Sequence, residues 1–378
     1  MFTIQQIDTT SKSQVNEFIQ FHYKLYAGTP QWVPPFISDI QAMLNRNKHP
    51  FYEHSEAEFF VAKDRKGEVV GRIGLLENKA FNRYHDTRNA NFYLFDVVDD
   101  LDAAKYLFDA VFEWCKKRNL NKIVGPKGFS LFDGYGIQIE GNDQRQMMTM
   151  MNYNFPYYGK FMEQLGFEKE VDFVSCYLPA ESFRIPERVE RIAKRVMERG
   201  KLKIKDFKSK KGLIQWAQRI GEAYNKAFVN NWEYYPLSQG DIEYAKNNIF
   251  MVADHRLIKL ILSGEEIVGF LFAFPDASSA LQRAKGRLFP FGIVDILLEM
   301  KRTKTVSGNG MGVLPEFQGM GGNALLYYEL GKTILENYNF KFVEMTQVAE
   351  TTHQMRADLK NLHGVEYKNH RVYRKAIG

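Results

Sequence analysis

The stretch Val313-Leu-Pro-Glu-Phe-Gln-Gly-Met-Gly-Gly-Asn-Ala324 is the most informative part of this 378-residue sequence. It follows a strand-like run at residues 305–313 and precedes an apolar helical pattern at residues 324–335. Glycines between a strand and a helix let backbone N–H groups converge on a ligand, and the helix start adds a partial positive charge. The stretch therefore predicts a phosphate-binding turn, with Gln318 beside its open side.

Two familiar phosphate-binding motifs do not describe this stretch. No Lys-Ser or Lys-Thr pair directly follows the glycines of this stretch, which excludes a P-loop, and the glycine spacing is not GxGxxG at a first strand–helix turn. A glycine-rich turn that only connects a strand to a helix is the alternative interpretation.

The plan around this stretch occurs twice in the chain, because short matches recur at one constant offset. Each match alone is weak, since glycines are common in turns, but three matches in one order indicate a tandem repeat. The matching pairs are Ser11-Lys12 with Ser209-Lys210, Gly67–Gly71 with Gly264–Gly269, and Leu165–Glu168 with His363–Glu366.

Each half of the repeat contains the same order of expected elements. A short strand (residues 2–8 or 202–207) precedes a helical pattern, a hairpin and a strand–helix–strand series, which residues 371–376 close in the second half. This order predicts an α+β (mixed α/β) fold of two units, each a mixed, mostly antiparallel twisted sheet flanked by helices. One of the expected helices joins Leu213, Trp216, Ile220 and Tyr224.

The expected boundaries place one unit at residues 1–180 and the other at residues 202–378. The linker at residues 181–201 is basic and predicted to be partly helical. Its charges are typical of a solvated helix face, and they come from Arg188, Arg191, Lys194 and Arg195.

Composition restricts the class of protein. The chain has 51 Lys and Arg against 45 Asp and Glu, and its net charge of +6 is too small for a nucleic-acid footprint by itself. Two cysteines exclude a disulfide scaffold and a four-thiolate zinc site. We see no signal peptide and no apolar run of the ~20 residues that span a bilayer, so we expect a cytoplasmic protein with no membrane span, no metal and no nucleic-acid partner.

The glycine-rich stretch resembles the acyl-CoA-binding motif of the GNAT superfamily of N-acyltransferases, V-x-P-x-x-[RQ]-x-x-G-x-[GA]. Val313, Pro315, Gln318 and Gly321 match that motif, whereas its last position holds Asn323, with Ala324 one residue later. The order of the surrounding elements also fits. The whole chain is therefore similar to a tandem GNAT protein, with the stronger likeness in the second half.

This resemblance implies a role for each residue of the turn. Backbone groups of Val313 and Leu314 would contact pantetheine, and His353 would be a polar contact of the cofactor. The pyrophosphate would lie on Gln318, Gly319, Met320, Gly321, Gly322, Asn323 and Ala324. The matching place in the first half, residues 99–103, has three aspartates and no glycine, so we expect acyl-CoA only in the second half.

The residues that carry out catalysis are less clear from the sequence. The tyrosine that the family usually has in its last helix is replaced by Lys360, and by Met162 in the first half. The fifth strand of the second half offers Glu344 as a general base, although a carboxylate there is often simply solvated or paired. Tyr373, on the closing strand, is a second candidate for catalysis.

Two further segments have no match in a simple GNAT plan. A long loop, at residues 125–136 and 147–154, is rich in aromatic residues and Met, and includes Asp133 and Tyr153. An apolar insertion at residues 287–301 has basic ends. It could be a lid, a dimer helix or a membrane-surface contact, and covering a sheet edge or the acceptor cleft is the simplest expectation.

The resulting hypothesis is an acyl-CoA-dependent N-acyltransferase, which most simply transfers acetyl from acetyl-CoA to a primary amine of a small molecule or peptide. A tandem-GNAT transferase with a long-chain acyl or aminoacyl donor is one alternative. A non-catalytic protein that binds CoA or docks a partner is the other. The sequence leaves a homodimer open.

Overall fold

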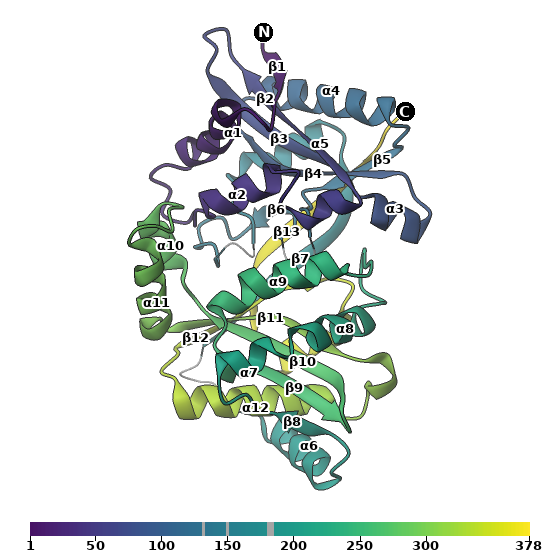
Figure 1. The fold of residues 1–378 in the computed structure, drawn as a ribbon, viewed down its shortest axis with the longest axis vertical. Helices are drawn as coiled ribbons and strands as arrows, with labels where there is room; N and C mark the ends of the chain where they lie inside the picture. Colours follow the sequence, from purple (N-terminus) through teal and green to yellow (C-terminus); the bar gives the residue numbers. More distant parts are fainter. Residues whose placement is uncertain (131–132, 149–150, 180–184) are drawn as a thin grey trace. The chain divides into compact units, whose positions relative to one another are not determined.

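The computed structural model describes residues 1–130, 133–148, 151–179 and 185–378 (Figure 1). Parts of the predicted long loop (131–132 and 149–150) and of the linker (180–184) lie outside the described residues. The chain divides into two compact units. The first unit comprises Met1–Val174, Ser278–Ile296 and Tyr367–Gly378, and the second comprises Ser175–Ala277 and Leu297–Glu366.

The first unit is built on a mixed sheet in the order β1, β2, β3, β4, β5, β13. Neighbouring strands are antiparallel except β4 and β5, which are parallel, and β6 pairs antiparallel with β13. The strand β7 begins in this unit and ends in the second. The bounds are β1 Thr3–Gln6, β2 Glu56–Lys63, β3 Val69–Glu77, β4 Asn89–Val97, β5 Lys122–Gly125, β6 Ile137–Glu140, β7 Glu168–Pro179 and β13 Val365–Ala376.

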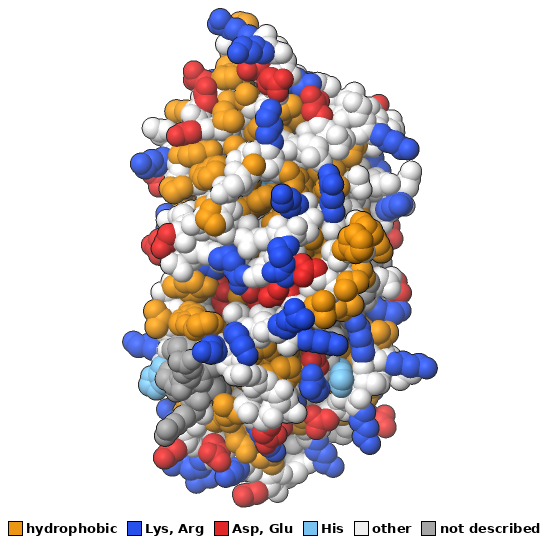
Figure 2. Space-filling view, turned by 90° about the vertical axis from the view of Figure 1, so that its left-hand side faces the viewer, with side chains coloured by type: hydrophobic (Ala, Val, Ile, Leu, Met, Phe, Trp, Pro, Cys, Tyr) orange, Lys and Arg blue, Asp and Glu red, His pale blue; other side chains and the backbone are white. Residues whose placement is uncertain are grey.

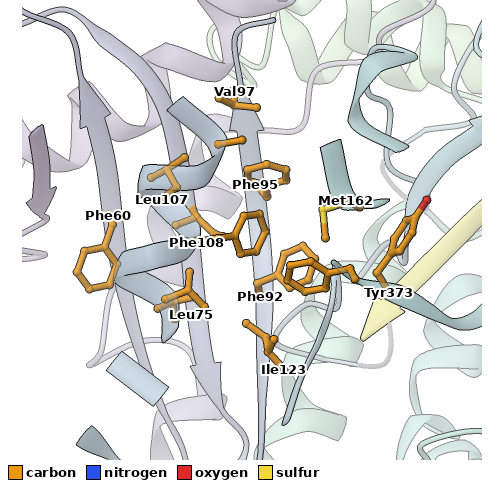
Figure 3. Packing of buried hydrophobic residues seen from close by; sticks show 14 of the residues in the cluster. Phe60, Leu75, Phe92, Phe95, Val97, Leu107, Phe108, Ile123, Met162 and Tyr373 are labelled. Carbon is orange, nitrogen blue, oxygen red and sulfur yellow. The ribbon is translucent and has the colours of Figure 1, made fainter. Parts of the chain in front are cut away.

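Both faces of this sheet are buried, each in its own core cluster. Successive side chains of a strand point to opposite faces, so neighbouring residues of one strand enter different clusters. On β2, Phe60 belongs to one core cluster and Phe59 to another. The first cluster includes α4 and α5, and Figure 3 shows Phe92, Phe95 and Phe108 packed at its centre. The second cluster includes α1 and α2. The bounds are α1 Lys12–Leu25, α2 Ile37–Leu44, α3 Lys79–His85, α4 Leu101–Lys117, α5 Tyr157–Gln164 and α10 Ser278–Ala284, with a short 3-10 turn, η1, at Pro50–Glu53.

The second unit has a mixed sheet in the order β12, β11, β10, β9, β8. Only β11 and β12 are parallel among the pairs of this series. The bounds are β8 Lys203–Lys205, β9 Ile258–Ser263, β10 Glu266–Pro275, β11 Thr305–Val313 and β12 Phe342–Ala349. The helices are α6 Glu187–Glu198, α7 Lys210–Ile214, α8 Ala217–Ala227, α9 Gln239–Val252, α12 Gly322–Asn337 and α13 His353–Asn361, with short turns η2 His255–Leu257 and η3 Pro315–Phe317; α11, Gly292–Arg302, runs across the division between the units.

The two faces of the second sheet carry different helices. Phe270 of β10 contacts Tyr224 and Phe228, whose ring centroids lie 6.1 and 5.5 Å away, so this face is covered by α8. On the opposite face α12 contacts β9 and β10. The mixed α/β architecture with flanking helices confirms the fold class expected from the sequence.

An irregularity shared by both sheets supports the predicted repeat. Between Arg72 and Gly74 of β3, the partner strand β4 has one extra residue, and the same extra residue occurs in β11 opposite Leu271–Ala273 of β10. Leu94 and Gly310 lie in these bulges with φ angles of 48° and 94°. A bulge bends the strand locally, and here both bulges precede the turn into the next helix.

Two details of the sequence expectation are wrong. The expected single helix through Leu213 and Tyr224 is divided, because α7 ends at Ile214 and Trp216 is the N-cap residue of α8. The strand expected to close the second half pairs instead with β5 of the first unit, where Tyr373 lies opposite Gly125. Residues 187–198 of the predicted linker form α6, which confirms its partly helical character; the four basic residues are exposed, and α6 belongs to the second unit.

Among the described residues, no helix is both long enough and apolar enough to cross a membrane.

Candidate functional site

The predicted phosphate-binding turn joins β11 to α12 in the second unit. After Val313, the N–H of Leu314 donates to the Val268 carbonyl at 2.9 Å and keeps the chain on the sheet. The turn η3 follows, and the Gln318 side-chain amide donates to the Val313 carbonyl at 3.2 Å. Gly319 and Gly321 have φ angles of 76° and 87°, which glycine adopts without strain and most other residues avoid.

Backbone donors at the start of α12 remain available. Among the described residues, none accepts a hydrogen bond from the N–H of Gly319 or from the N–H groups of residues 321–324. The first N–H groups of a helix have no partner inside the helix, and a ligand can accept from them. The Met320 N–H already donates a long hydrogen bond to the Phe317 carbonyl, at 3.4 Å. Among the residues predicted to bind the pyrophosphate, Met320 is therefore less available as a donor to a ligand. The residues present therefore fit a pyrophosphate.

The linker helix α6 borders this turn, which the sequence analysis did not predict. A Cβ atom added to Gly321 would lie 2.7 Å from the Val196 side chain and 3.0 Å from that of Ile192. In contrast, no atom lies within 4 Å of a Cβ atom added to Gly319. Gly321 is needed for close packing against α6, whereas Gly319 faces open space.

The sheet opens beside the turn. Backbone pairing between β11 and β12 covers Thr305–Gly308 and Phe342–Met345 only, although both strands continue. Beyond that point the Asn309 amide donates to the Thr346 hydroxyl at 3.1 Å, so a side chain takes over from the backbone ladder. The unpaired edge of β11 leads to Val313 and Leu314, where the resemblance places pantetheine.

Glu344 lies on β12 beside this opening. Its register partner is Ser307, which is in turn opposite Phe274 of β10, so these three residues share a face of the sheet. Phe270 and Phe272 stack on each other on the same face, which α8 covers. The Glu344 side chain is only 3% exposed. Glu344 is therefore a buried carboxylate near the point where the backbone pairing of β12 with β11 ends.

The remaining predicted residues of the second unit lie on α13. His353 is its first residue and is exposed, and Lys360, which replaces the usual tyrosine, is exposed near its other end. The helix is tied to the turn, because the Asn323 amide donates to the Asp358 carboxylate at 3.2 Å. Asn323, which departs from the family motif, therefore has a positioning contact.

Tyr373 and Met162 belong to the first unit. Both are buried in the core cluster that Figure 3 shows, with Tyr373 2% exposed. Burial raises the pKa of Tyr373. The structure does not bring Tyr373 into the second unit, where the glycine-rich turn lies.

The first unit differs from the second at the matching turn. Asp100 is the N-cap residue of α4, and its carboxylate accepts a hydrogen bond from the Ala103 N–H at 3.1 Å. The parallel pairing of β4 and β5 also ends early, but there the Lys127 N–H donates to the Phe92 carbonyl at 2.9 Å. In the first unit, therefore, Asp100 occupies a donor at the helix start and Lys127 occupies the strand edge. The corresponding groups of the second unit are available to a ligand.

The long loop of the first unit is packed against its own core. The N–H of Ser130 donates to the Asp133 carboxylate at 2.9 Å, and burial raises the pKa of Asp133 to about 6. Tyr153 is 8% exposed and lies in an aromatic cluster with Tyr26 and Trp32. These contacts support a structural role for the described part of the loop.

A buried polar network in the first unit was missed by the sequence analysis. The Asp96 carboxylate accepts from Arg72 Nε at 2.7 Å and lies 2.8 Å from His22 Nδ1. The indole N–H of Trp32 can only donate, so His22 Nε2, 3.2 Å away, must be the acceptor and Nδ1 must carry the proton. Both ring nitrogens of His22 are therefore used. The one signal in the sequence was Arg72, a charge inside the apolar run of residues 69–76.

A second buried histidine predicts how the first unit responds to pH. His370 Nε2 lies 2.9 Å from the Asn152 carbonyl and must carry the proton, while Nδ1 has no partner among the described residues. Burial lowers the pKa of His370 from 6.5 to about 3. The unfolded chain then binds the extra proton first, so stability falls as pH falls below 6.5, by about 2 kcal/mol between pH 7 and pH 5.

We expect His370→Gln, whose side-chain amide can donate the same hydrogen bond, to lose less stability than the wild type over that pH range. Urea unfolding at pH 7 and pH 5 measures the difference. Equal pH dependence in the two proteins would show that His370 is not the group that titrates.

Comparisons with known proteins cover the whole chain. It is 27% identical over 377 residues to a bacterial ceramide synthase from Caulobacter vibrioides (strain NA1000 / CB15N). The alignment covers 98% of this chain and 97% of that protein. It is 25% identical over 372 residues to Protein YghO from Escherichia coli (strain K12), which covers 97% of this chain and 94% of that protein. No family model matches the chain.

Solved structures give the fold. A tandem GNAT protein from the clavulanic acid biosynthesis pathway superposes with a TM-score of 0.57 at 12% identity, over 100% of this chain and 99% of the other. A GCN5-related N-acetyltransferase from Sphaerobacter thermophilus superposes with a TM-score of 0.53 at 13% identity, over 100% and 96% of the two chains. Together with the repeated bulges, these likenesses confirm the fold that the sequence resemblance implied: the chain has a tandem GNAT-like fold.

Proposed function

We propose that this protein is an acyl-CoA-dependent N-acyltransferase and that its acyl-CoA site is the β11–α12 turn of the second unit. The observation that carries the proposal is the set of backbone N–H groups, at Gly319 and residues 321–324, that no described residue accepts from. They lie at a helix start, next to a strand edge that can hold an extended pantetheine. The first unit, with Asp100 at its helix start, would not bind the cofactor.

The chemistry of this transfer needs few groups from the protein. The amine nitrogen attacks the thioester carbonyl carbon, the carbon–sulfur bond breaks, and CoA leaves as a thiolate that takes up a proton. The amine must lose a proton to a base, and we propose Glu344 for this role because it is buried on the sheet face beside β11. Tyr373 stays a second candidate for catalysis, and it lies in the buried core of the first unit.

Two classes of donor and acceptor follow from different observations. The GNAT resemblance suggests acetyl-CoA and a small primary amine. The ceramide synthase relative, similar along nearly the whole chain, supports a fatty acyl-CoA and a long-chain amine, since a ceramide is an N-acylated long-chain amino alcohol. We favour the second class, because identity is higher and extends over both units.

The site is best tested with Gly319→Asp and the matched variant Gly319→Asn. Both side chains tolerate a positive φ, and the Cβ atom has room, so the fold should persist in both. Only Asp adds a negative charge to the proposed pyrophosphate site. We expect roughly ten- to a hundredfold weaker CoA binding for Asp than for Asn, since like charges a few ångströms apart repel by about 1–3 kcal/mol.

Calorimetry with CoA measures this difference. A second series with acetyl-CoA and palmitoyl-CoA, the latter below its micelle concentration, compares donors in the wild type. Equal CoA affinity of the two variants, or no affinity in the wild type, would contradict the proposed site. Binding without release of CoA to any short- or long-chain amine would favour the non-catalytic alternative.

A further inference from the structure

The segment around α11 exposes apolar side chains that a soluble surface rarely groups together. Phe289 and Phe291 are 73% and 79% exposed, and Val294, Leu297 and Leu298 are 54%, 50% and 40% exposed. Figure 2, which faces the side where α10 and α11 lie in Figure 1, shows hydrophobic side chains in orange bordered by Lys and Arg in blue. Contiguous exposed apolar patches usually mark a contact with another surface.

The exposed residues form one stripe of the helix. Val294, Leu297 and Leu298 follow the three- and four-residue spacing of one helix face, and the exposed Phe291, three residues before Val294, immediately precedes the helix. Ile296, on the opposite face, is 4% exposed and anchors the helix to the protein. A helix of a soluble protein normally turns its apolar face inward, whereas α11 has an additional apolar face outward.

Basic residues surround this stripe. Residues 283–304 contain six Lys or Arg and two acidic residues, a net charge of +4 in a chain whose total is +6. Asp295 is held in a two-point ion pair by Arg283, at 2.8 and 2.9 Å. The other five basic side chains are exposed and form no ion pair with any described residue; they are Lys285, Arg287, Lys301, Arg302 and Lys304.

We propose that the stripe formed by Phe289, Phe291, Val294, Leu297 and Leu298 inserts into the interface of an anionic membrane, with the surrounding Lys and Arg side chains on lipid headgroups. Exposed aromatic and aliphatic side chains beside unpaired cations are the combination that holds a peripheral protein in the headgroup region. A second copy of this chain fits less well. In a two-fold dimer the patch would meet itself, and its five unpaired cations would repel their copies.

This inference does not depend on the proposed enzymatic function, and its test needs no activity. Full-length protein is sedimented with vesicles of phosphatidylcholine alone or with about one third phosphatidylglycerol. One variant, Phe289→Ser with Phe291→Ser, removes exposed rings, and its control, Leu335→Ser, removes an exposed apolar residue of α12. A second variant, Lys301→Gln with Arg302→Gln, removes cations from the last turn of α11. Its matched control, Lys116→Gln with Lys117→Gln, does the same on α4.

We expect the wild type to bind the anionic vesicles and to bind phosphatidylcholine weakly. Loss of two cations should weaken binding by about thirtyfold, at the contribution usual for Lys and Arg near an anionic surface. Loss of the two rings should weaken it at least about tenfold. Both control variants should bind like the wild type.

Three results would overturn the proposal. The first is no binding of the wild type to anionic vesicles. The second is binding that neither variant weakens, because another surface would then be responsible. The third is a dimer, seen by light scattering, that Phe289→Ser with Phe291→Ser dissociates while vesicle binding is absent.

Discussion

Replacing Glu344 by Gln should lower kcat at least about a hundredfold while acyl-CoA binding stays within a factor of two, as expected when a general base is removed. Gln keeps the size of the side chain and can form hydrogen bonds in the same buried position, but it cannot take the proton that the amine must lose. The measurement is release of CoA with the donor and amine that give the highest turnover in the wild type, together with calorimetry of CoA.

Glu350→Gln is the matched control, because Glu350 directly follows β12, where Glu344 lies, and is only partly buried. It should leave kcat close to the wild-type value. A pH–rate profile adds a readout that a structural role would not change: the rising limb should disappear in Glu344→Gln. If kcat is unchanged in this variant, or if CoA affinity falls in parallel with kcat, Glu344 is not the base.

Much of the fold could be predicted from the sequence because the decisive signals are local. The hairpins β2–β3 and β9–β10 are marked by polar turns between alternating runs, and the structure contains both. The pairing of the last strand, β13, with β5 of the first unit could not be predicted in this way. The alternating pattern of residues 371–376 indicates a strand, but it does not say which sheet that strand joins, and the structure pairs it with β5.

The helical pattern through Trp216 was misleading for a related reason. Apolar spacing continues across a short break, so a pattern alone cannot show that α7 ends at Ile214. Only the backbone conformation separates it from α8, which begins at Ala217.

The candidate site shows the same limit. The glycine-rich turn could be found because its residues are consecutive, and the structure has backbone N–H groups there that no described residue accepts from. The packing of α6 on Gly321 could not be found, because the residues involved are more than a hundred positions apart in the sequence. The same holds for His22, Arg72 and Asp96, which meet from α1, β3 and β4.

This buried network leads to the largest expected effect on stability. Asp96→Asn should lower the free energy of unfolding by roughly 3–5 kcal/mol, because it leaves the Arg72 guanidinium, 1% exposed, without its counter-charge. A comparison is offered by Arg118, whose ion pairs with Glu56 and Glu77 lie where its side chain is 27% exposed. Arg118→Met should cost less than about 1 kcal/mol, as surface pairs usually do.

The expected loss of stability in Asp96→Asn comes from breaking the Arg72–Asp96 ion pair, and not from the loss of one side chain as such. Removing both charges, with Arg72→Met and Asp96→Leu in one chain, should be less destabilising than Asp96→Asn alone, because no buried charge is then left unpaired. Urea unfolding at pH 7, followed by circular dichroism, measures all four proteins. If the double variant loses as much stability as Asp96→Asn or more, the cost lies in packing around Tyr26 and Trp32 and not in the uncompensated charge. An Asp96→Asn protein as stable as Arg118→Met would also contradict this explanation, because leaving the buried Arg72 charge unpaired would then have no measurable cost.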